Sequence, residues 1–331
     1  MLALVTGGTG FIGAHVVRTL LEQGLEVRIL VRSTSDHAAL VDLPVKVILG
    51  DLTDAFSLEQ AVTGVDLLFH VAADYRLWVP DPHAMHAVNV EGTRSLLRAA
   101  EEARVRRIVY TSSVVTVRCS AGRPGTELDF VSVDESRSVY QRTKVLAEQA
   151  VWHMIKQGLP ITIVNPSTPV GAGDRRPTPT GRLIVDFLNR RLPAFFDAVL
   201  NWVDVKDVAL GHWLAATRGR IGERYILGGQ NLPLGQFLKI LSEVSGLAAP
   251  RARIPYAVAY LAGMAGTAWA HVTGREPQVS LDGVRMAGRP MLYDSTKAVR
   301  ELGLPQTPLR EAAQQAVRWF RDHGYVDRGG A

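Results

Sequence analysis

The sequence of 331 residues lacks the features that define several classes of protein. It has one cysteine, Cys119, so neither a disulfide framework nor a cysteine zinc cluster can form within the chain. His83 and His86 stand three residues apart but have no evident third ligand, and we therefore expect no metal. The arginines are dispersed, aromatics make up only 7% of the residues, and the net charge is a modest +5. We accordingly expect no nucleic-acid partner.

Long apolar runs are also missing. The residues from Tyr256 to Ala270 are nearly uncharged, but the run is shorter than the ~20 residues that a transmembrane helix needs. We interpret it as a buried helix, with peripheral membrane contact or a wall for an apolar substrate as alternatives. The first residues pass directly into a predicted strand, with no room for a signal peptide. The expected location is cytoplasmic.

A glycine-rich loop close to the start organises the chain. It reads Thr6-Gly7-Gly8-Thr9-Gly10-Phe11-Ile12-Gly13 and lies between a short apolar run and a segment of helical periodicity. A dinucleotide-phosphate loop requires a strand, a glycine turn and a helix in this order. Gly7 would allow the turn, Gly10 the approach of a pyrophosphate and Gly13 close helix packing. We predict a dinucleotide bound at the helix N-terminus.

Strands and helices alternate through the first half of the chain. This alternation predicts an α/β fold with a Rossmann-type, doubly wound parallel sheet and right-handed crossovers. We assign residues 1–170 to the cofactor domain and 171–327 mainly to a smaller, mostly helical substrate lobe, with 200–217 returning to the sheet and 328–331 as a tail. The expected strands are 2–5, 26–31, 45–49, 65–71, 107–110 and 161–164, and the expected helices of this half are 54–62, 83–103 and one that opens at Tyr140.

The end of the second strand predicts which dinucleotide binds. A carboxylate there would bind the ribose hydroxyls of NAD, whereas an arginine suits the 2′-phosphate of NADP. The strand ends in Arg32 and Ser33, with no acid. NADP(H) is therefore preferred and NAD(H) remains an alternative. If Arg32 is only a solvated surface charge, it carries no preference.

Three residues form the predicted catalytic set. Tyr140 and Lys144 are four apart and share a helical face, and Ser113 ends a central strand at the same sheet edge as the glycine loop. A nearby cation should lower the pKa of a tyrosine by favouring the phenolate. Tyr140 would then exchange a proton with a carbonyl or alcohol oxygen, and Ser113 would hydrogen-bond that oxygen.

A Pro- and Arg-rich stretch, 173–182, follows the sixth strand. We interpret it as a substrate loop whose arginines bind an anionic group, with a solvated linker as the alternative. The candidate substrate residues are Asp74, Ser113, Val114, Tyr140, Arg175, Arg176 and Arg182. The lobe should contain a strand at 224–227 and helices at 183–191, 234–245, 256–272, 295–302 and 309–323.

Taken together, these motifs resemble the extended short-chain dehydrogenase/reductase superfamily over nearly the whole chain. The resemblance is closest to its dihydroflavonol 4-reductase-like branch and, within that, to the bacterial hopanoid-associated sugar epimerases, although 118–135 differs from that group. It implies that Asp51 contacts adenine, that Asn89 supports the active site and that Lys144 also holds the nicotinamide ribose. The motifs that carry it give this cofactor set: Gly7, Thr9, Gly10, Phe11, Ile12, Gly13, Arg32, Ser33, Asp51, Leu52, Val71, Ala72, Ala73, Asn89, Thr111, Lys144, Asn165, Pro166 and Ser167. Thr143 replaces a common serine.

Three functions agree with these observations. The first is an NADP(H)-dependent oxidoreductase that reduces a carbonyl or oxidises a secondary alcohol. The second is a nucleotide-sugar epimerase with a retained cofactor, and the third is a non-catalytic NADP-sensing protein. The resemblance also implies a homodimer through the helices that begin near His83 and Tyr140.

Overall fold

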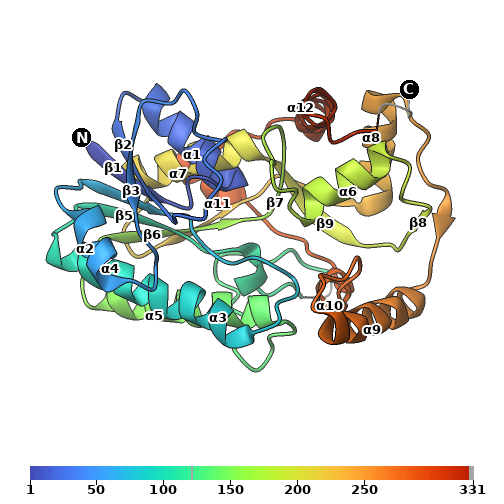
Figure 1. Cartoon of the computed structure of the whole chain (residues 1–331), viewed down its shortest axis with the longest axis horizontal. Coiled ribbons are helices and arrows are strands. Elements are labelled where there is room, and N and C mark those ends of the chain that lie inside the picture. The colour runs from blue at the N-terminus through green and yellow to red at the C-terminus, as the bar shows by residue number, and fades with distance from the viewer. Residues whose placement is uncertain (121, 328–331) are drawn as a thin grey trace.

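The computed structural model describes residues 1–120 and 122–327, so the predicted tail at 328–331 lies outside the described residues. A seven-stranded parallel sheet forms its core, in the order β10-β6-β5-β4-β1-β2-β3 (Figure 1). The predicted Rossmann-type α/β fold is confirmed. The strands are β1 (Leu2–Thr6), β2 (Glu26–Val31), β3 (Val45–Leu49), β4 (Leu67–His70), β5 (Arg107–Thr111), β6 (Ile161–Pro166) and β10 (Arg224–Leu227).

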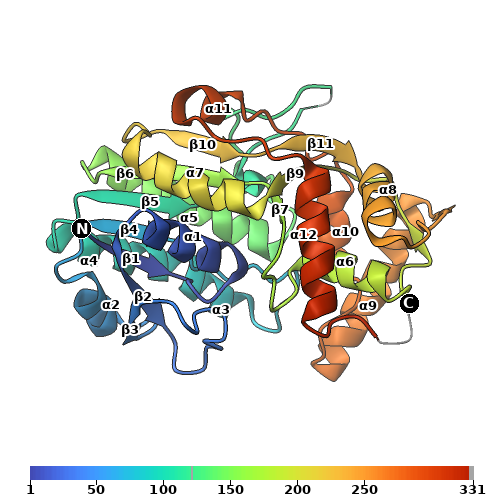
Figure 2. The same ribbon diagram turned by 90° about the horizontal axis from the view of Figure 1, so that it is seen from above.

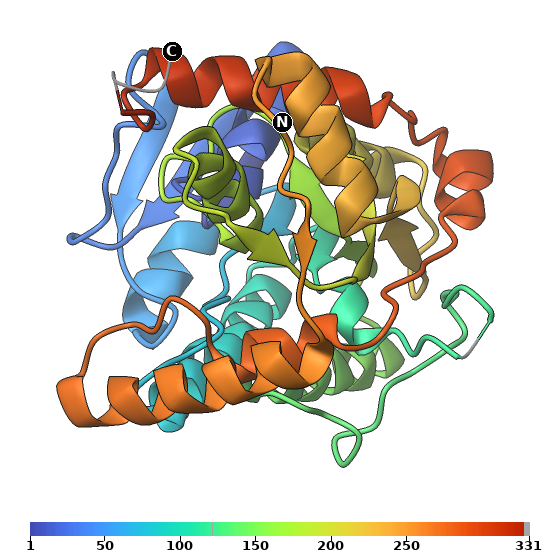
Figure 3. The same cartoon turned by 90° about the vertical axis from the view of Figure 1, so that its right-hand side faces the viewer.

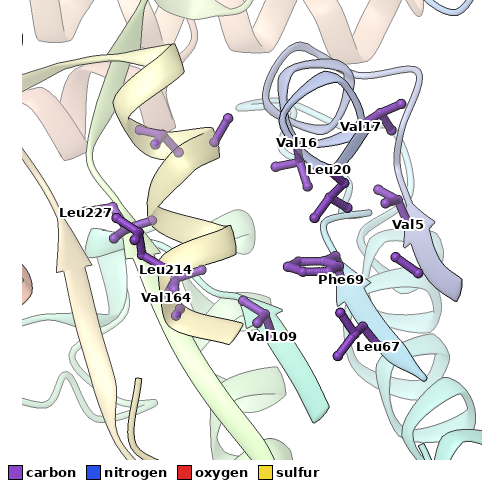
Figure 4. Close-up of a cluster of buried hydrophobic side chains, with 14 of the residues drawn as sticks. Val5, Val16, Val17, Leu20, Leu67, Phe69, Val109, Val164, Leu214 and Leu227 are labelled. Carbon is purple, nitrogen blue, oxygen red and sulfur yellow. The ribbon is translucent and has the colours of Figure 1, made fainter. Parts of the chain in front are cut away.

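Helices cover both faces of this sheet. Figures 1 and 2 show α1 (Phe11–Glu22) and α7 (Val205–Thr217) on one face, with α11 (Thr296–Leu302) beside α7. The opposite face carries α2 (Ala55–Val62), α4 (Gly92–Glu102) and α5 (Val139–Lys156). Each face buries its own apolar cluster. In Figure 4 side chains of α1, among them Val16 and Leu20, lie close to Phe69 of β4.

The expected helix at 83–103 is interrupted. It consists of α3 (Pro82–His86), a π-helical turn η1 (Ala87–Glu91) and α4. The turn contains Asn89, whose side chain is buried and bonded to two other segments. Such π turns widen a helix by one residue and often occur at functional sites. Hydrophobic periodicity cannot predict the hydrogen bonds of Asn89, because they join segments far apart in the chain.

The C-terminal lobe has a small sheet that the sequence did not predict. Its three strands lie in the order β11-β9-β7, so residues 199–204 do not return to the Rossmann sheet, and that part of the prediction is wrong. The following helix, α7, does pack against α1. The lobe strands are β7 (Thr168–Val170), β9 (Val199–Asp204) and β11 (Gln230–Pro233), with β8 (Ala194–Phe195) and β12 (Ala252–Arg253) paired separately.

Strand β10 was expected in the lobe but pairs in parallel with β6 at the edge of the Rossmann sheet. The cofactor half therefore draws on chain beyond residue 170. Around the lobe core lie α6 (Pro179–Leu188), α8 (Leu234–Ser245) and α12 (Leu309–Asp322). Helix α6 begins at Pro179, four residues earlier than expected, so Arg182 belongs to a helix and not to a loop.

Two further helices complete the lobe. They are α9 (Tyr256–Thr273) and α10 (Leu281–Ala287), and the sequence did not predict α10. They pack against each other, and α9 lies along the lower edge of the molecule in Figure 3. None of the described helices is long and apolar enough to cross a membrane.

Candidate active site

The glycine loop is packed tightly onto the end of β4. Gly7 has a φ of +73°, and a Cβ there would come within 2.7 Å of the Ala72 backbone. A Cβ at Gly13 would collide with the carbonyl of Gly7, so the first turn of α1 lies directly on the loop. Only a glycine fits either position without a shift of the backbone.

The start of α1 suits an anionic group. Its N-cap residue is Gly10, which provides no side-chain cap, whereas α2, α5, α6 and α7 are capped by the side chains of Asp54, Ser138, Thr178 and Asp204. The first N–H groups of a helix need an acceptor, and the helix dipole favours a negative charge. These residues therefore fit the pyrophosphate of a dinucleotide.

The residues expected at the adenosine end lie after β2 and β3. Arg32 and Ser33 are exposed, and within the described chain no carboxylate pairs with Arg32. The carboxylate of Asp51 accepts hydrogen bonds from the Thr53 N–H and hydroxyl at 2.8 and 2.7 Å. A cation and a hydroxyl facing solvent fit a 2′-phosphate.

The predicted catalytic residues come from two neighbouring elements. Ser113 follows β5 and caps the 3₁₀ turn η2 (Val114–Thr116), while Tyr140 lies in the first turn of α5. Lys144 is 3% exposed, and its Nζ donates to the Thr111 carbonyl at 2.9 Å. The structure thus holds Ser113, Tyr140 and Lys144 at the carboxyl edge of the sheet.

Burial changes the acid–base properties of this set. It raises the pKa of Tyr140, and a hydrogen bond with the Ser113 side chain opposes that shift. Burial thus outweighs the lowering of the Tyr140 pKa that its spacing from Lys144 predicted. Desolvation lowers the pKa of Lys144 to about 8, with Glu148 acting in the opposite direction. A tyrosine hydroxyl with a raised pKa stays protonated at neutral pH.

Asn89 ties the catalytic helix to the loop after β4. Its Nδ2 donates to the Asp74 carbonyl at 2.8 Å and to Thr143 Oγ1 at 3.0 Å, and its Oδ1 accepts from the Asp74 N–H at 2.7 Å. The Thr143 hydroxyl in turn donates to the Tyr140 carbonyl at 2.9 Å. The threonine that replaces a common serine thus connects Asn89 to Tyr140.

Behind the site lies a buried ion pair that the sequence did not predict. Glu148, one turn after Lys144, pairs with Arg224 of β10 at 2.9 Å, and both side chains are at most 3% exposed. The other carboxylate oxygen accepts from Ser112, from Thr116 at 2.7 Å and from Asn165 at 3.1 Å. The i,i+4 spacing of Lys144 and Glu148 places Glu148 on the same face of α5 as Lys144. Its partner Arg224 lies 76 residues away in the sequence, so no local pattern indicates the ion pair.

Asn165 is also part of this network. Its Nδ2 donates to the Ser113 carbonyl at 3.0 Å, which fixes the end of β5 at Ser113. Thr111 bonds through its hydroxyl to His212 of α7 at 2.9 Å. The other predicted cofactor residues line the same sheet edge from the β1, β3, β4 and β6 ends: Thr9, Phe11, Ile12, Leu52, Val71, Ala72, Ala73, Pro166 and Ser167.

The candidate substrate residues divide into two groups. Val114 is 2% exposed and packs in a small apolar cluster, so it offers no surface to a ligand. Arg175, Arg176 and Arg182 are exposed, and Arg182 pairs with Glu276 at 3.4 Å.

Tyr75 connects these arginines to the β4 end. Tyr75 is 44% exposed, and its pKa is raised by partial desolvation and by Asp174, whereas Arg176 and Arg182 lower it. Its neighbour Asp74 is held by Arg76 at Nε–Oδ distances of 3.0 and 3.2 Å. The charges of the arginine stretch therefore act within electrostatic range of the loop after β4.

Comparison with known proteins agrees with this geometry. The fold and the site define an enzyme that depends on a nicotinamide dinucleotide. The family model described as "NAD dependent epimerase/dehydratase family" matches residues 3–228. The chain belongs to this family, within the extended short-chain dehydrogenases/reductases.

Three curated relatives cover almost the whole chain. A Synechocystis protein with a provisional dihydroflavonol 4-reductase name is 45% identical over 97% of this chain and 95% of its own. "Sterol demethylase protein B" of Methylococcus capsulatus is 38% identical over 98% and 100%. A Stigmatella aurantiaca ketoreductase of a farnesyl-dihydroquinoline oxide is 32% identical over 99% and 98%.

Among solved structures, a nucleoside-diphosphate-sugar epimerase from Pseudomonas aeruginosa is also similar. It superposes with a TM-score of 0.83 at 28% identity and covers 99% of both chains. The family therefore includes both reductases and epimerases.

Proposed function

We propose that this protein is an NADP(H)-dependent reductase of a carbonyl group. The observation that carries the proposal is the convergence of Ser113, Tyr140 and Lys144 beside the uncapped start of α1. NADP(H), when bound, supplies the hydride for reduction or accepts it in the reverse direction. The glycine loop would hold its pyrophosphate and Arg32 its 2′-phosphate.

Each catalytic residue then has one role. The Tyr140 hydroxyl donates a proton to the carbonyl oxygen, and the Ser113 hydroxyl hydrogen-bonds the same oxygen and orients it. Lys144 would hold the ribose of the cofactor.

The substrate is proposed to be a ketone on a lipophilic molecule. The similar proteins with a sterol and a farnesyl group in their names support this class. An epimerase with a retained cofactor is the second candidate, favoured by the arginines near Tyr75, which could bind a diphosphate. The homodimer and the sensing function stay predictions.

Replacement of the proton donor tests the mechanism. Tyr140→Phe should lower kcat with NADPH by about 10²–10⁴. Tyr110→Phe is the matched control, because Tyr110 is buried on the neighbouring strand and its hydroxyl has no partner among the described residues. Near-normal turnover of Tyr140→Phe would refute the assignment, and turnover lost in Lys144→Ala would exclude a non-catalytic sensor.

The cofactor content separates the two enzymatic candidates. Freshly purified protein is denatured gently, and the released nucleotides are quantified by mass spectrometry. A reductase exchanges its cofactor in each turnover, so we expect little bound nucleotide and tighter binding of NADPH than of NADH. Stoichiometric NAD or NADP would instead support the epimerase.

A further inference from the structure

Helix α9 presents large apolar side chains to the solvent. We call the α9 outer face the set of exposed residues Val258, Leu261, Met264, Trp269 and Val272. Leu261 is 59% exposed, Trp269 68% and Val272 82%. In Figures 1 and 3 α9 lies at the periphery of the molecule. An exposed apolar patch of this kind marks an interaction surface.

The inner side of α9 consists of small residues. Ala259, Gly263 and Ala270 are its buried residues, and Gly263 lies against the backbone of Leu281 at the start of α10. A surface helix of a soluble domain normally turns its large apolar residues inward. In α9 this arrangement is reversed, so burial within the chain does not explain the outer face.

Arginines flank the helix at both ends, and the nearby carboxylates of Asp197 and Glu276 pair with Arg253 and Arg182 at 3.3 and 3.4 Å. Residues 254–274 contain no Asp, Glu, Lys or Arg, and His271 is the residue among them that can gain a positive charge. Arg251 and Arg253 precede the helix, and Arg275 and Arg289 follow it, all of them exposed. Within the described chain, Arg251, Arg275 and Arg289 have no carboxylate at ion-pair distance. An apolar surface with cationic ends is complementary to an anionic lipid bilayer.

We propose that the α9 outer face docks on the surface of an anionic membrane, with α9 parallel to the bilayer. Trp269, 68% exposed, lies toward the C-terminal end of the helix, and an amphipathic ring of this kind favours the headgroup region. A second copy of the chain fits less well, because pairing two α9 faces would bring cationic ends together at either relative orientation. The helix is too short and flanked too closely by arginines to insert across the bilayer.

The same helix pair reaches the candidate active site. The Asp282 carboxylate of α10 accepts from the Val139 N–H at 3.2 Å, directly before Tyr140, and Met286 accepts from the Ser138 hydroxyl at 3.4 Å. On the other side, His271 of α9 contacts the Trp78 ring in the loop after β4. A membrane-bound α9 would therefore place the site close to the lipid surface. This position agrees with a lipophilic substrate, but the docking itself does not rest on the proposed reductase function.

Vesicle co-sedimentation of the full chain tests the proposal without substrate or cofactor. Phosphatidylglycerol–phosphatidylcholine vesicles should bind the protein, phosphatidylcholine alone should bind it less, and added salt should weaken the binding. Leu261→Glu with Trp269→Glu should lower binding by roughly tenfold or more, because two charges enter the apolar face. Phe56→Glu is the control, since Phe56 is 67% exposed on α2, away from α9.

The charge contribution is measured separately. Arg251→Gln with Arg275→Gln should lower binding to the anionic vesicles by roughly thirtyfold, which corresponds to ~1 kcal/mol for each of the two basic residues near the surface. Arg98→Gln with Arg94→Gln on exposed α4 positions is the matched control. Absence of vesicle binding by the wild-type chain would overturn the proposal. A concentration-dependent dimer that Leu261→Glu dissociates, without vesicle binding, would assign the face to a second copy instead. Loss of reductase activity alone would leave the docking result unaffected.

Discussion

Helices α5 and α9 have the same length of 18 residues but opposite relations to the solvent. Helix α5 buries eight residues, among them the charged Lys144 and Glu148, whereas α9 buries only three small ones. Helix α5 thus buries charged side chains, whereas α9 exposes large apolar ones. Such reversals of the usual pattern occur where a protein binds or reacts rather than where it only folds.

The two reversals are stabilised differently. In α5 each buried charge has polar partners: Glu148 meets Arg224 and several donors, and Lys144 meets a carbonyl. In α9 the side chains of the outer face are exposed, and the helix is held by its packing on α10 and by ring contacts of Tyr256 with Phe196 and of His271 with Trp78. We therefore expect substitutions in α5 to affect stability strongly and those on the α9 outer face to affect it little.

The largest effect is expected at the buried ion pair. Glu148→Ala leaves the Arg224 guanidinium, 2% exposed, without its carboxylate, and should lower the free energy of unfolding by about 3–5 kcal/mol. Urea unfolding measures the change, and Glu148→Gln gives a milder variant if the alanine variant does not fold. Glu102→Ala on exposed α4 is the control, with a change within about 0.5 kcal/mol. A loss no larger than this control would show that Arg224 finds another partner.

Lys144 should make a smaller, pH-dependent contribution. Its pKa is about 8 when folded and near 10.5 when unfolded, because burial disfavours the charged form. Below pH 8 both states are protonated and the full desolvation penalty destabilises the fold. Between pH 8 and 10.5 the unfolded state binds more protons, so this penalty is relieved as the pH rises.

Unfolding experiments on Lys144→Met and the wild type at several pH values measure this effect. The stability advantage of the methionine variant should be greatest at neutral pH and should shrink above pH 8. Subtracting the unfolding free energies of the two proteins at each pH cancels the contributions from the titration of other groups. An advantage that stayed constant from pH 7 to 10 would contradict the lowered pKa of Lys144.

The smallest effect is expected within α9. A Cβ at Gly266 would come within 2.7 Å of the Val279 carbonyl, so Gly266→Ala should destabilise by about 1–3 kcal/mol despite its better helix propensity. Leu261→Glu on the outer face should change the stability by no more than about 0.5 kcal/mol. Both are measured by urea unfolding. Equal changes in the free energy of unfolding for Gly266→Ala and Leu261→Glu would contradict the distinction between the packed and the exposed side of α9.

Local patterns explain why much of the site was predictable. The glycine loop, the strand ends and the Tyr140–Lys144 pair each depend on residues a few positions apart, and the parallel sheet brings their ends to one edge. The small lobe sheet was not predictable in this way. Its strand β7 has three residues, and it pairs Thr168 with Trp202, which in turn pairs with Gln230.

The sequence by itself determined the class of fold, the cofactor loop and the catalytic candidates, because period-2 and period-3.6 patterns and glycine requirements are written locally. The sequence also showed that Tyr256 to Ala270 is apolar, but we expected that helix to be buried. Only the tertiary structure decided which side of α9 faces solvent, that β10 joins the Rossmann sheet and that Arg224 meets Glu148. These features depend on contacts between residues far apart in the chain, which no local pattern specifies.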